Sequence, residues 1–596
     1  MTNVEIASIL REMSAYYSMD DVAWKPAAYE KAAAAISGHD YQMSFIYKNK
    51  GLRGLEDVPG IGPHIAAHIQ TLLRHKTFSE LKAYRKKYPV HLLELTSVES
   101  VGPKTVKTLY KKLGIRDLED LERAARTGKL SKLKNFGPRS EARILDAVLR
   151  LRQVEGRKFL GEVLGVARDF ETRMRSVPGV AHAVVAGSVR RMQETIGDID
   201  LLVTAKNLAK ARQAFLDFPE VARIIEEGKT KVAVELKNGM RADIRLVPDS
   251  EFGAALQYFT GDKNHNIEVR KIAISKGYKL NEYGLFKGEH KLAAATEEAI
   301  YAKLGLDYME PELRTNSGEI EAAKMDSRPR QARTGLRGND GKSALPNLIK
   351  YSDLRGDLQV QSSWTDGRNS IEQMAREAMK LGLEYIAITD HSQALAFAHG
   401  LNPKDLEKQG REIDLINQKI KKSKNQLHIL KGIECDILKS GKMDLPDSTL
   451  AKLDFVGASI HSHFKLPRAE QTKRLIRAMK NPHVDIIFHP TTRRIGRREE
   501  ADMDLDLIFK TARATNTLLE INASDRMDLR DVHIRRALKF GVKFMINSDS
   551  HSIAQLASLE LGIAQARRGW VTKKDVLNSR NLDEIKKWLM TPKAER

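Results

Sequence analysis

The sequence predicts a multidomain protein in which helical repeats come first, an α+β module follows, and a distorted parallel α/β barrel ends the chain. A length of 596 residues corresponds to about four domains of ordinary size. Glycine-containing turns recur before residue 150, and alternating strand patterns follow them. Beyond residue 345, short apolar strands alternate with helical segments, which is typical of a parallel α/β fold.

The composition favours a polyanionic partner in a reducing environment. Lys and Arg together number 100 against 78 Asp and Glu, a formal net charge of +22. This excess favours nucleic acid, with an anionic membrane surface as the rival. The single cysteine, Cys435, excludes a disulfide framework and a cysteine-rich zinc site. Glu5 near the start, and the lack of a run of about 18 apolar residues, predict a cytoplasmic chain that is neither exported nor membrane-bound.

A glycine-proline turn occurs three times near the N-terminus, each time before a helical pattern. The copies lie at 58–63, 101–105 and 136–139, the last ending in Arg139. In a helix-hairpin-helix element, glycine permits the tight turn, and the amides that begin the second helix can hold a phosphate. One copy would fit an ordinary helix connection, but three copies in a basic protein favour DNA contact. The expected contact glycines are Gly60, Gly62, Gly102 and Gly137.

The middle of the chain has strand patterns followed by helices. Strands are expected at 183–185, 198–203, 231–235 and 241–247, with a hairpin at Asn238-Gly239. Helices are expected at 266–276 and 296–304. An aperiodic segment rich in Arg, Gly, Ser and Asp then predicts a linker at 325–344.

Three carboxylates of this module predict a metal-dependent phosphoryl-transfer site. Asp198 and Asp200 are two residues apart on one expected strand, so both side chains project from the same face. Asp243 can supply a third carboxylate from a neighbouring strand. Clustered carboxylates repel one another unless divalent cations neutralise them, and two Mg²⁺ ions suit an in-line attack at phosphorus. The alternative, a solvated Asp-x-Asp at a strand end, is common when that motif stands alone.

A phosphate-binding loop precedes the two aspartates. Gly187 allows close backbone approach, and Ser188 offers a hydroxyl donor. Arg190 and Arg191 offer guanidinium groups to triphosphate oxygens.

The run 187–200, together with 241–247 and 258–261, resembles the palm and thumb of family X DNA polymerases over about the first 320 residues. The resemblance implies that Asp198 and Asp200 hold both Mg²⁺ ions, for which Mn²⁺ can substitute. It implies that Asp243 holds the catalytic metal and helps to activate the primer 3'-OH. The implied nucleotide-binding residues are Gly187, Ser188, Arg191, Tyr258, Phe259, Gly261, Asn266 and Arg270.

The same resemblance concerns the N-terminal helices. Lys25 and Tyr29 lie where the family's N-terminal domain binds the 5'-phosphate of a gap. His68 stands in place of the lysine that forms a Schiff base in the family's deoxyribose-phosphate lyases. Imidazole cannot form that iminium, so we expect no lyase activity from this position and at most DNA binding by His64 and His68.

Histidine and carboxylate residues gather at the ends of strands expected at 386–389, 427–430, 455–458, 486–488, 518–521 and 544–547. Residues at the ends of parallel strands can meet in one cleft, as ligands of Mn²⁺ or Zn²⁺ do. From residue 345 the chain resembles the PHP (polymerase and histidinol phosphatase) domain, a (β/α)7-type barrel and metal-dependent phosphoesterase, often a 3'-to-5' exonuclease. The implied ligands are Glu434, His461 and His489 for one metal, Asp366, His391 and His551 for another, and Glu434 with Asp549 for the first position.

The PHP motif is altered at its start. Gln359 and Gln361 replace both histidines of the opening His-x-His. Neutral amides are poor ligands for a transition metal beside imidazole, so the first metal position should be weak or empty. A crippled nuclease retained as a scaffold is therefore favoured over a nuclease that works with fewer metals.

The expected domains are 1–85 (helical, DNA-end-binding), 86–150 (helical, fingers-like), 151–262 (palm), 263–324 (thumb) and 345–596 (PHP barrel). The expected function is template-directed filling of short gaps by a monomer, with gapped or primer-template DNA and deoxynucleoside triphosphates as partners. The alternatives are a non-templated nucleotidyltransferase, a non-catalytic DNA-binding scaffold, hydrolysis of histidinol phosphate, and a polymerase with an active exonuclease.

Overall fold

The computed structural model covers residues 1–596 and describes all of them except 2, 38–41, 59, 97, 99–100, 134–135, 139, 143, 146–147, 149–156, 325–344, 396–397 and 423–426. The chain forms two compact units, Met1–Glu155 with Gly496–Glu499, and Gly156–Ile495 with Glu500–Arg596. The predicted linker, the boundary between residues 150 and 151, and Arg139 lie outside the described residues. In the described part of the chain, every helix is too short or too polar to cross a bilayer.

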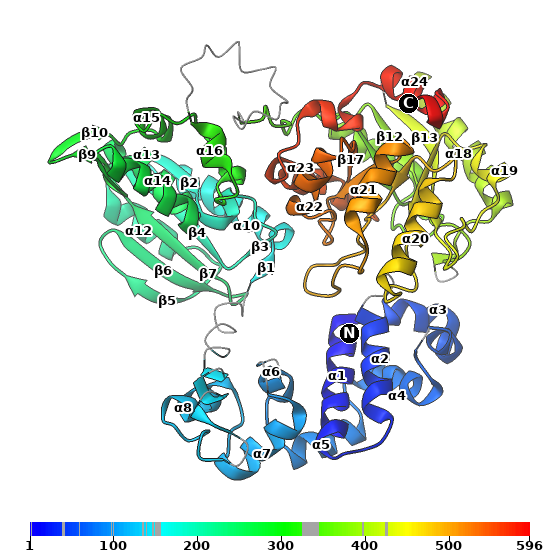
Figure 1. Ribbon diagram of the computed structural model, residues 1–596, viewed down its shortest axis with the longest axis horizontal. Coiled ribbons are helices and arrows are strands. Elements are labelled where there is room, and N and C mark those ends of the chain that lie inside the picture. Colours follow the sequence, from blue (N-terminus) through cyan, green and yellow to red (C-terminus); the bar gives the residue numbers. More distant parts are fainter. Residues whose placement is uncertain are drawn as a thin grey trace. The chain divides into compact units, whose positions relative to one another are not determined.

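The first unit is built from helices in its described residues (Figure 1). They are α1 (Asn3–Met19), α2 (Lys25–Ser37), α3 (Met43–Glu56), α4 (Pro63–His75), α5 (Ser79–Lys87), α6 (Leu92–Thr96), α7 (Pro103–Leu113) and α8 (Leu118–Arg126).

The three predicted hairpins share one turn geometry. Ile61, Val101 and Phe136 each donate their backbone amide to the carbonyl three residues earlier. Helices α4 and α7 both begin after an extended glycine N-cap with proline at the first helical position, where proline's missing N–H costs nothing. The predicted helix-hairpin-helix class is confirmed.

The palm is a five-stranded mixed sheet in the order β2-β4-β7-β6-β5. The turn at Asn238-Gly239 joins β6 to β7 as predicted, with Gly239 at φ +77°. Sequence patterns missed β5, because this edge strand is almost wholly exposed and lacks apolar alternation. The palm strands are β2 (Val180–Val185), β4 (Asp198–Ala205), β5 (Val221–Glu227), β6 (Lys231–Leu236) and β7 (Arg241–Leu246). Helices α10 (Leu160–Arg175) and α12 (Leu208–Leu216) contribute to the same core, and β1 (Lys158–Phe159) pairs with β3 (Thr195–Ile196).

The thumb consists of helices around a small antiparallel sheet. Its elements are α13 (Phe252–Thr260), α14 (Lys263–Ser275), β8 (Lys279–Asn281), β9 (Gly284–Lys287), β10 (His290–Ala293), α15 (Glu297–Lys303) and α16 (Glu319–Ala323). Helix α13 lies within the range expected for the palm, but its Ala254 shares a core with Val269 and Leu285 of the thumb. Helix α14 begins three residues before its predicted start, because the Asp262 side chain accepts the His265 amide as an N-cap.

Seven parallel strands form the C-terminal barrel, in spatial order that follows the sequence. They are β11 (Gly356–Val360), β12 (Tyr385–Ile388), β13 (His428–Asp436), β14 (Phe455–Ser459), β15 (Ile486–Ile487), β16 (Leu518–Asn522) and β17 (Phe544–Asn547). A bridge between Val360 and Ser550 brings the end of the last strand beside the first. The predicted distorted (β/α)7-type barrel is confirmed, with β11 added to the six strands that patterning identified.

A helix follows each barrel strand, and two follow the last one, so that all strand C-termini reach one rim. These helices are α17 (Ile371–Lys380), α18 (Pro403–Lys422), α19 (Asp447–Leu450), α20 (Arg468–Met479), α21 (Leu505–Ala514), α22 (Asp531–Lys539), α23 (Leu559–Arg568) and α24 (Leu582–Met590).

The barrel packs directly against the palm within the second unit. Met527 and Leu561 of the barrel share an apolar core with Val189 of the palm. Beside this core, Arg493 donates to both carboxylate oxygens of Glu194, with Nη1–Oε1 at 3.1 Å and Nη2–Oε2 at 2.6 Å. The loop that follows the phosphate-binding segment is therefore held by the barrel.

Candidate active site

Three aspartates of the palm lie together because β4 and β7 are parallel neighbours. In their register, Asp200 lies opposite Asp243, and Asp198 lies opposite Arg241. Side chains alternate along a strand, so Asp198 and Asp200 share the face to which Asp243 also points. The sequence prediction of one shared face agrees with this register.

The cluster carries more negative charge than its neighbours neutralise. Burial, followed by the charges of Asp198 and Asp243, raises the pKa of Asp200 to about 7. Burial and the charge of Asp243 likewise raise the pKa of Asp198. Asp243 has a partner, since Arg241 donates to its two oxygens at 2.7 and 2.8 Å. Carboxylates in this arrangement fit divalent cations, whose binding removes the mutual repulsion.

The phosphate loop is fixed against these carboxylates by glycine. Gly187 has φ +60°, and a Cβ at this position would lie 2.2 Å from Asp200 Oδ2. Both facts require glycine, because other residues rarely adopt this φ and none could keep the carboxylate in place. In the described part of the chain, the buried Ser188 hydroxyl has no hydrogen-bond partner. Its donor is therefore available to a ligand.

A cavity of about 420 Å³ is lined by Asp198, Asp200 and the loop, whereas Asp243 lies outside its lining. It brings together the palm residues and the thumb residues that the sequence analysis assigned to the nucleotide. Its lining residues are Arg157, Gly187, Ser188, Arg191, Asp198, Asp200, Tyr258, Phe259, Gly261, Asp262, Lys263, Asn266 and Arg270. Arg157, Asp262 and Lys263 were missed. The last two follow Gly261 directly and could have been noticed, whereas Arg157 lies in no motif.

The two adjacent arginines of the loop have different roles. Arg191 lines the cavity and donates from Nη1 to the Thr260 carbonyl. Arg190 lies outside the cavity lining and instead donates to Glu297 Oε1 and Oε2 at 2.9 and 2.7 Å. The expected triphosphate contact of Arg190 is therefore corrected to an ion pair between palm and thumb.

The thumb side of the cavity is held by a short hydrogen-bond chain. Asn266 Nδ2 donates to the Tyr258 carbonyl at 2.7 Å, and Arg270 Nε donates to the Asn266 carbonyl at 3.2 Å. The rings of Tyr258 and Phe259 meet edge to face with centroids 5.1 Å apart. These contacts hold Tyr258, Phe259, Asn266 and Arg270 together on the thumb side of the cavity.

In the first unit, Tyr29 is 2% exposed and its hydroxyl lies 3.2 Å from His64 Nδ1 and 2.8 Å from His68 Nδ1. Lys25 Nζ lies 3.4 Å from Glu80 Oε1. At the hairpin glycines Gly62, Gly102 and Gly137, a Cβ would meet nothing within 4 Å, while at Gly60 (φ +97°) it would lie 3.2 Å from Lys31.

At the barrel rim, Glu434 lies at the centre of a histidine cluster. His489 Nε2 is 2.9 Å and His461 Nε2 is 3.2 Å from Glu434 Oε1, and His391 Nδ1 is 3.5 Å from Oε2. Burial alone would raise the pKa of Glu434, but the charges of His391 and His461 hold it well below its ordinary value. Burial lowers the pKa of His489 to about 4. One ligand atom each from His391, Glu434 and His461 lie within 4.8 Å of one another.

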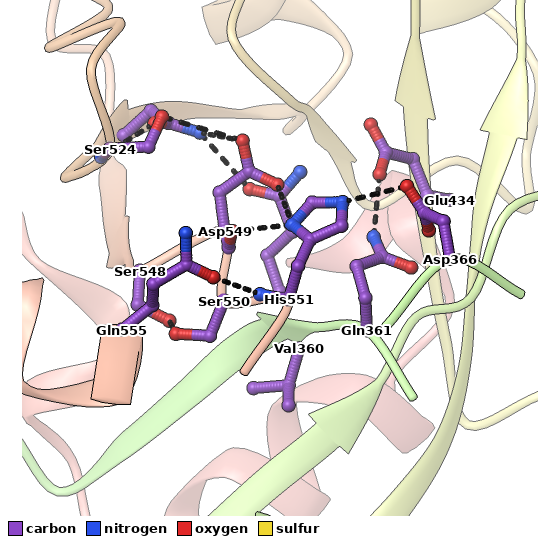
Figure 2. Close-up of polar contacts among 12 residues, drawn as sticks. Val360, Gln361, Asp366, Glu434, Ser524, Ser548, Asp549, Ser550, His551 and Gln555 are labelled. Carbon is purple, nitrogen blue, oxygen red and sulfur yellow. Dashed lines mark hydrogen bonds and ion pairs between the residues drawn. The ribbon is translucent and has the colours of Figure 1, made fainter. Parts of the chain in front are cut away.

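A second group adjoins the first through His391. His391 Nε2 lies 3.6 Å from Asp366 Oδ1, and His551 Nε2 lies 3.2 Å from Asp366 Oδ2. Burial would lower the pKa of His551, but Asp366 raises it to about 10. Figure 2 shows His551 between Asp366 and Asp549. Both histidine groups have the ligand types that transition metals select.

The glutamines that replace the opening histidines act as hydrogen-bond donors. Gln361 Nε2 donates to Glu434 Oε2 at 2.8 Å (Figure 2). With its amide oriented to satisfy its neighbours, Gln359 donates to Glu520 Oε1 at 2.6 Å. Asp549 accepts from Asn522 at 3.2 Å and lies 3.4 Å from Arg526 Nε. Sequence reasoning missed Glu520, although a carboxylate inside an apolar strand was a signal.

Comparisons with known proteins agree with this architecture. Residues 1–78 match a helix-hairpin-helix domain, 92–148 a SAM-like helix-hairpin-helix tandem, 255–315 the DNA polymerase beta thumb, and 357–524 the PHP domain.

Three relatives illustrate the extent of the similarity. The chain is 36% identical over 596 residues to the DNA polymerase/3'-5' exonuclease PolX of Bacillus subtilis, covering 99% of each chain. It is 27% identical to DNA polymerase lambda of Rattus norvegicus, covering 52% of this chain and 56% of that one. It is 30% identical to a probable phosphatase of Thermoanaerobacter sp., covering 38% of this chain and 90% of that one. The chain therefore belongs to the family X DNA polymerases that carry a C-terminal PHP domain.

Proposed function

We propose that this chain is a template-directed DNA polymerase that fills short gaps in DNA repair. The observation that carries the proposal is the convergence of Asp198 and Asp200 with Asp243 on neighbouring strands, the first two lining a cavity that also has basic and aromatic residues. A DNA-binding scaffold would have no physical need for this cluster, in which burial and the neighbouring carboxylates raise the pKa values of Asp198 and Asp200.

Palm residues would hold the reactants in line. Asp198 and Asp200 would hold two Mg²⁺ ions, or Mn²⁺ in their place, and Asp243 would share the catalytic one. Such cations activate the attacking hydroxyl and stabilise charge at phosphorus. The Ser188 hydroxyl, which has no hydrogen-bond partner among the described residues, and the Arg191 guanidinium would donate hydrogen bonds to triphosphate oxygens.

Thumb residues would complete the nucleotide site. Tyr258, Phe259 and Gly261 would line the sugar and disfavour a ribose, because these residues leave little room beside it. Asn266 and Arg270 would contact the nucleotide and the template minor groove. Their positions on the lining of one cavity support these assignments.

DNA would be held through its backbone. The amides that begin the second helix of each hairpin lie next to glycines, and the net charge of +22 favours a polyanion. The partners would be gapped or primer-template DNA and deoxynucleoside triphosphates, bound by a monomer. Gap-end recognition favours the templated reaction over a non-templated nucleotidyltransferase, which has little use for a 5'-phosphate site.

The PHP barrel would have a weakened or lost 3'-to-5' exonuclease activity. Gln361 and Gln359 bind carboxylates that a metal would otherwise engage. A nuclease that works with fewer metals is the second candidate. It is favoured by the intact groups His391–Glu434–His461 and Asp366–His391–His551, which could hold Mn²⁺ or Zn²⁺.

Primer extension on a one-nucleotide gap, with and without a 5'-phosphate, tests the polymerase. We expect extension by the wild type, stimulation by the 5'-phosphate, and no extension by Asp243→Ala. Asp217→Ala removes an exposed palm carboxylate outside the cavity and should leave activity unchanged. Full activity of Asp243→Ala would contradict the proposal.

The barrel needs its own experiment. Metal content by mass spectrometry, with primer degradation in Mn²⁺, should show few bound ions and slow degradation. Rapid degradation that His461→Ala abolishes would instead establish the active nuclease.

A further inference from the structure

A cluster of potential metal ligands lies in the first unit, apart from the palm and the barrel. His64 and His68 are four residues apart on α4, so their rings lie on one face of the helix. Glu80 lies in the first turn of α5. One ligand atom from each of the three lies within 4.8 Å of the others. Two histidines at this spacing with a carboxylate from another element form a common protein site for zinc.

The two imidazoles are already oriented. The hydroxyl of the buried Tyr29 lies within hydrogen-bond distance of Nδ1 of both His64 and His68. The His68 ring also stacks on Phe78, with centroids 4.0 Å apart. Ligand histidines in metal sites are usually held in this way through the nitrogen that does not bind the metal. When the Nδ1–H of each ring donates to the tyrosine oxygen, Nε2 of that ring keeps its lone pair for a ligand.

The charge state of the cluster suits a cation. Lys25 Nζ lies 3.4 Å from Glu80 Oε1, and both side chains are partly exposed. Such an exposed pair contributes little, so Glu80 can exchange it for a metal. The competing interpretation is that Lys25 alone neutralises Glu80 and the histidines only pack.

We propose that His64, His68 and Glu80 bind one divalent transition-metal ion, for which Zn²⁺ is the probe. A tetrahedral Zn²⁺ about 2.0–2.2 Å from each ligand holds ligand atoms about 3.4 Å apart. Small rotations of the exposed His64 and the half-buried Glu80 would close the remaining distance.

Three protein ligands leave the fourth position of zinc open. Resting on the proposed function, we assign this position to an oxygen of the DNA 5'-phosphate, because Lys25 lies beside the cluster. The ion would supply, at His68, the positive charge that a lysine would otherwise bring.

Zinc stoichiometry of the full chain tests the metal site without DNA. The metal-free protein is loaded with Zn²⁺, desalted and analysed by mass spectrometry, so that only differences between variants count. We expect His64→Gln/His68→Gln to retain one ion fewer than the wild type, and Glu80→Gln to lose the same ion at lower chelator concentration. His75→Gln, exposed in the last turn of the same helix, should match the wild type. Equal zinc content in all four proteins would overturn the proposal, provided that circular dichroism shows the variants folded.

A binding assay tests the open position. Gapped duplexes with and without a 5'-phosphate are compared at equimolar Zn²⁺ and after chelation. Zinc should increase the preference for the phosphorylated gap in the wild type and in His75→Gln, but not in the double variant. Zinc binding without this change would remove the phosphate assignment and leave the metal site. Primer extension is measured separately, with the wild type and Asp243→Ala. A wild type that does not extend the primer, or an Asp243→Ala variant that does, would contradict the proposed polymerase function and would leave the metal site untouched.

Discussion

The ion pair that joins palm to thumb should be one of the largest single contributions to stability outside the apolar cores. Glu297 is 4% exposed and accepts from Arg190, while Arg314, which is fully buried, donates from Nη1 to the same carboxylate. Burial would raise the pKa of Glu297, but Arg314 and Arg190 outweigh it and lower the pKa to about 2.

The magnitude follows from linkage. A carboxyl whose pKa falls from 4.5 to about 2 on folding stabilises the folded state by about 3 kcal/mol at neutral pH. Removing one partner of a buried pair costs a similar amount, about 3–5 kcal/mol, because the other charge is left buried. Since the folded pKa is depressed, this contribution is constant above pH 4.5 and is lost as the pH falls toward 2. At pH 4, about 1 kcal/mol of it is gone.

Thermal unfolding of Glu297→Gln measures how much the ion pair contributes to the free energy of unfolding. We expect a midpoint roughly 5–10 °C below wild type at pH 7.5, the same difference at pH 5.5, and a smaller difference at pH 4. The Michaelis constant for nucleotide should also rise, because Arg190 adjoins the residues of the phosphate loop. Glu298→Gln, an exposed neighbour on α15, is the matched control. A wild-type midpoint for Glu297→Gln at pH 7.5, or a difference that grows as the pH falls, would refute the reasoning.

Three further outcomes follow from the site. Gly187→Ala should abolish primer extension in a folded protein, because its Cβ would press on a carboxylate oxygen 2.2 Å away. Gly239 also has a positive φ, +77°, but a Cβ there would meet nothing within 4 Å, so Gly239→Ala should remain active, and equal activities of the two variants would disprove the steric account. Arg493→Ala removes the ion pair that holds Glu194 of the palm loop, so it should raise the Michaelis constant for nucleotide without unfolding the barrel. Unchanged kinetics would show that this ion pair does not position the nucleotide site. Gln361→His should increase the Mn²⁺ retained by the chain, because an imidazole replaces the amide bonded to Glu434. Unchanged metal content would contradict the idea that Gln361 weakens the first metal position of the barrel.

Local patterns predicted the elements that local forces determine. The hairpins were visible because a tight turn requires glycine and the next helix accepts proline at its start. The same reasoning missed β5, since an exposed edge strand has no apolar alternation, and it placed the start of α14 late because it overlooked the Asp262 cap.

The sequence could predict most residues of the palm site, but it could not predict which of them contact one another. The Asp-x-Asp spacing places two carboxylates on one face whatever surrounds the strand. Spacing could not show that Arg190 turns to Glu297 while Arg191 faces the cavity, or that Arg157 reaches the lining.

The sequence by itself determined the order of the modules, the two aspartates on one strand face, and the glutamines at the positions where the PHP resemblance implies histidines, because these depend on residue identity, periodicity and motif. Only the tertiary structure decided which charges face one another. It placed the replacing glutamines against Glu434 and Glu520, and it set His64 and His68 beside Glu80. The physical reason is that hydrogen bonds and ion pairs act over a few ångströms, so they depend on packing between segments far apart in the chain.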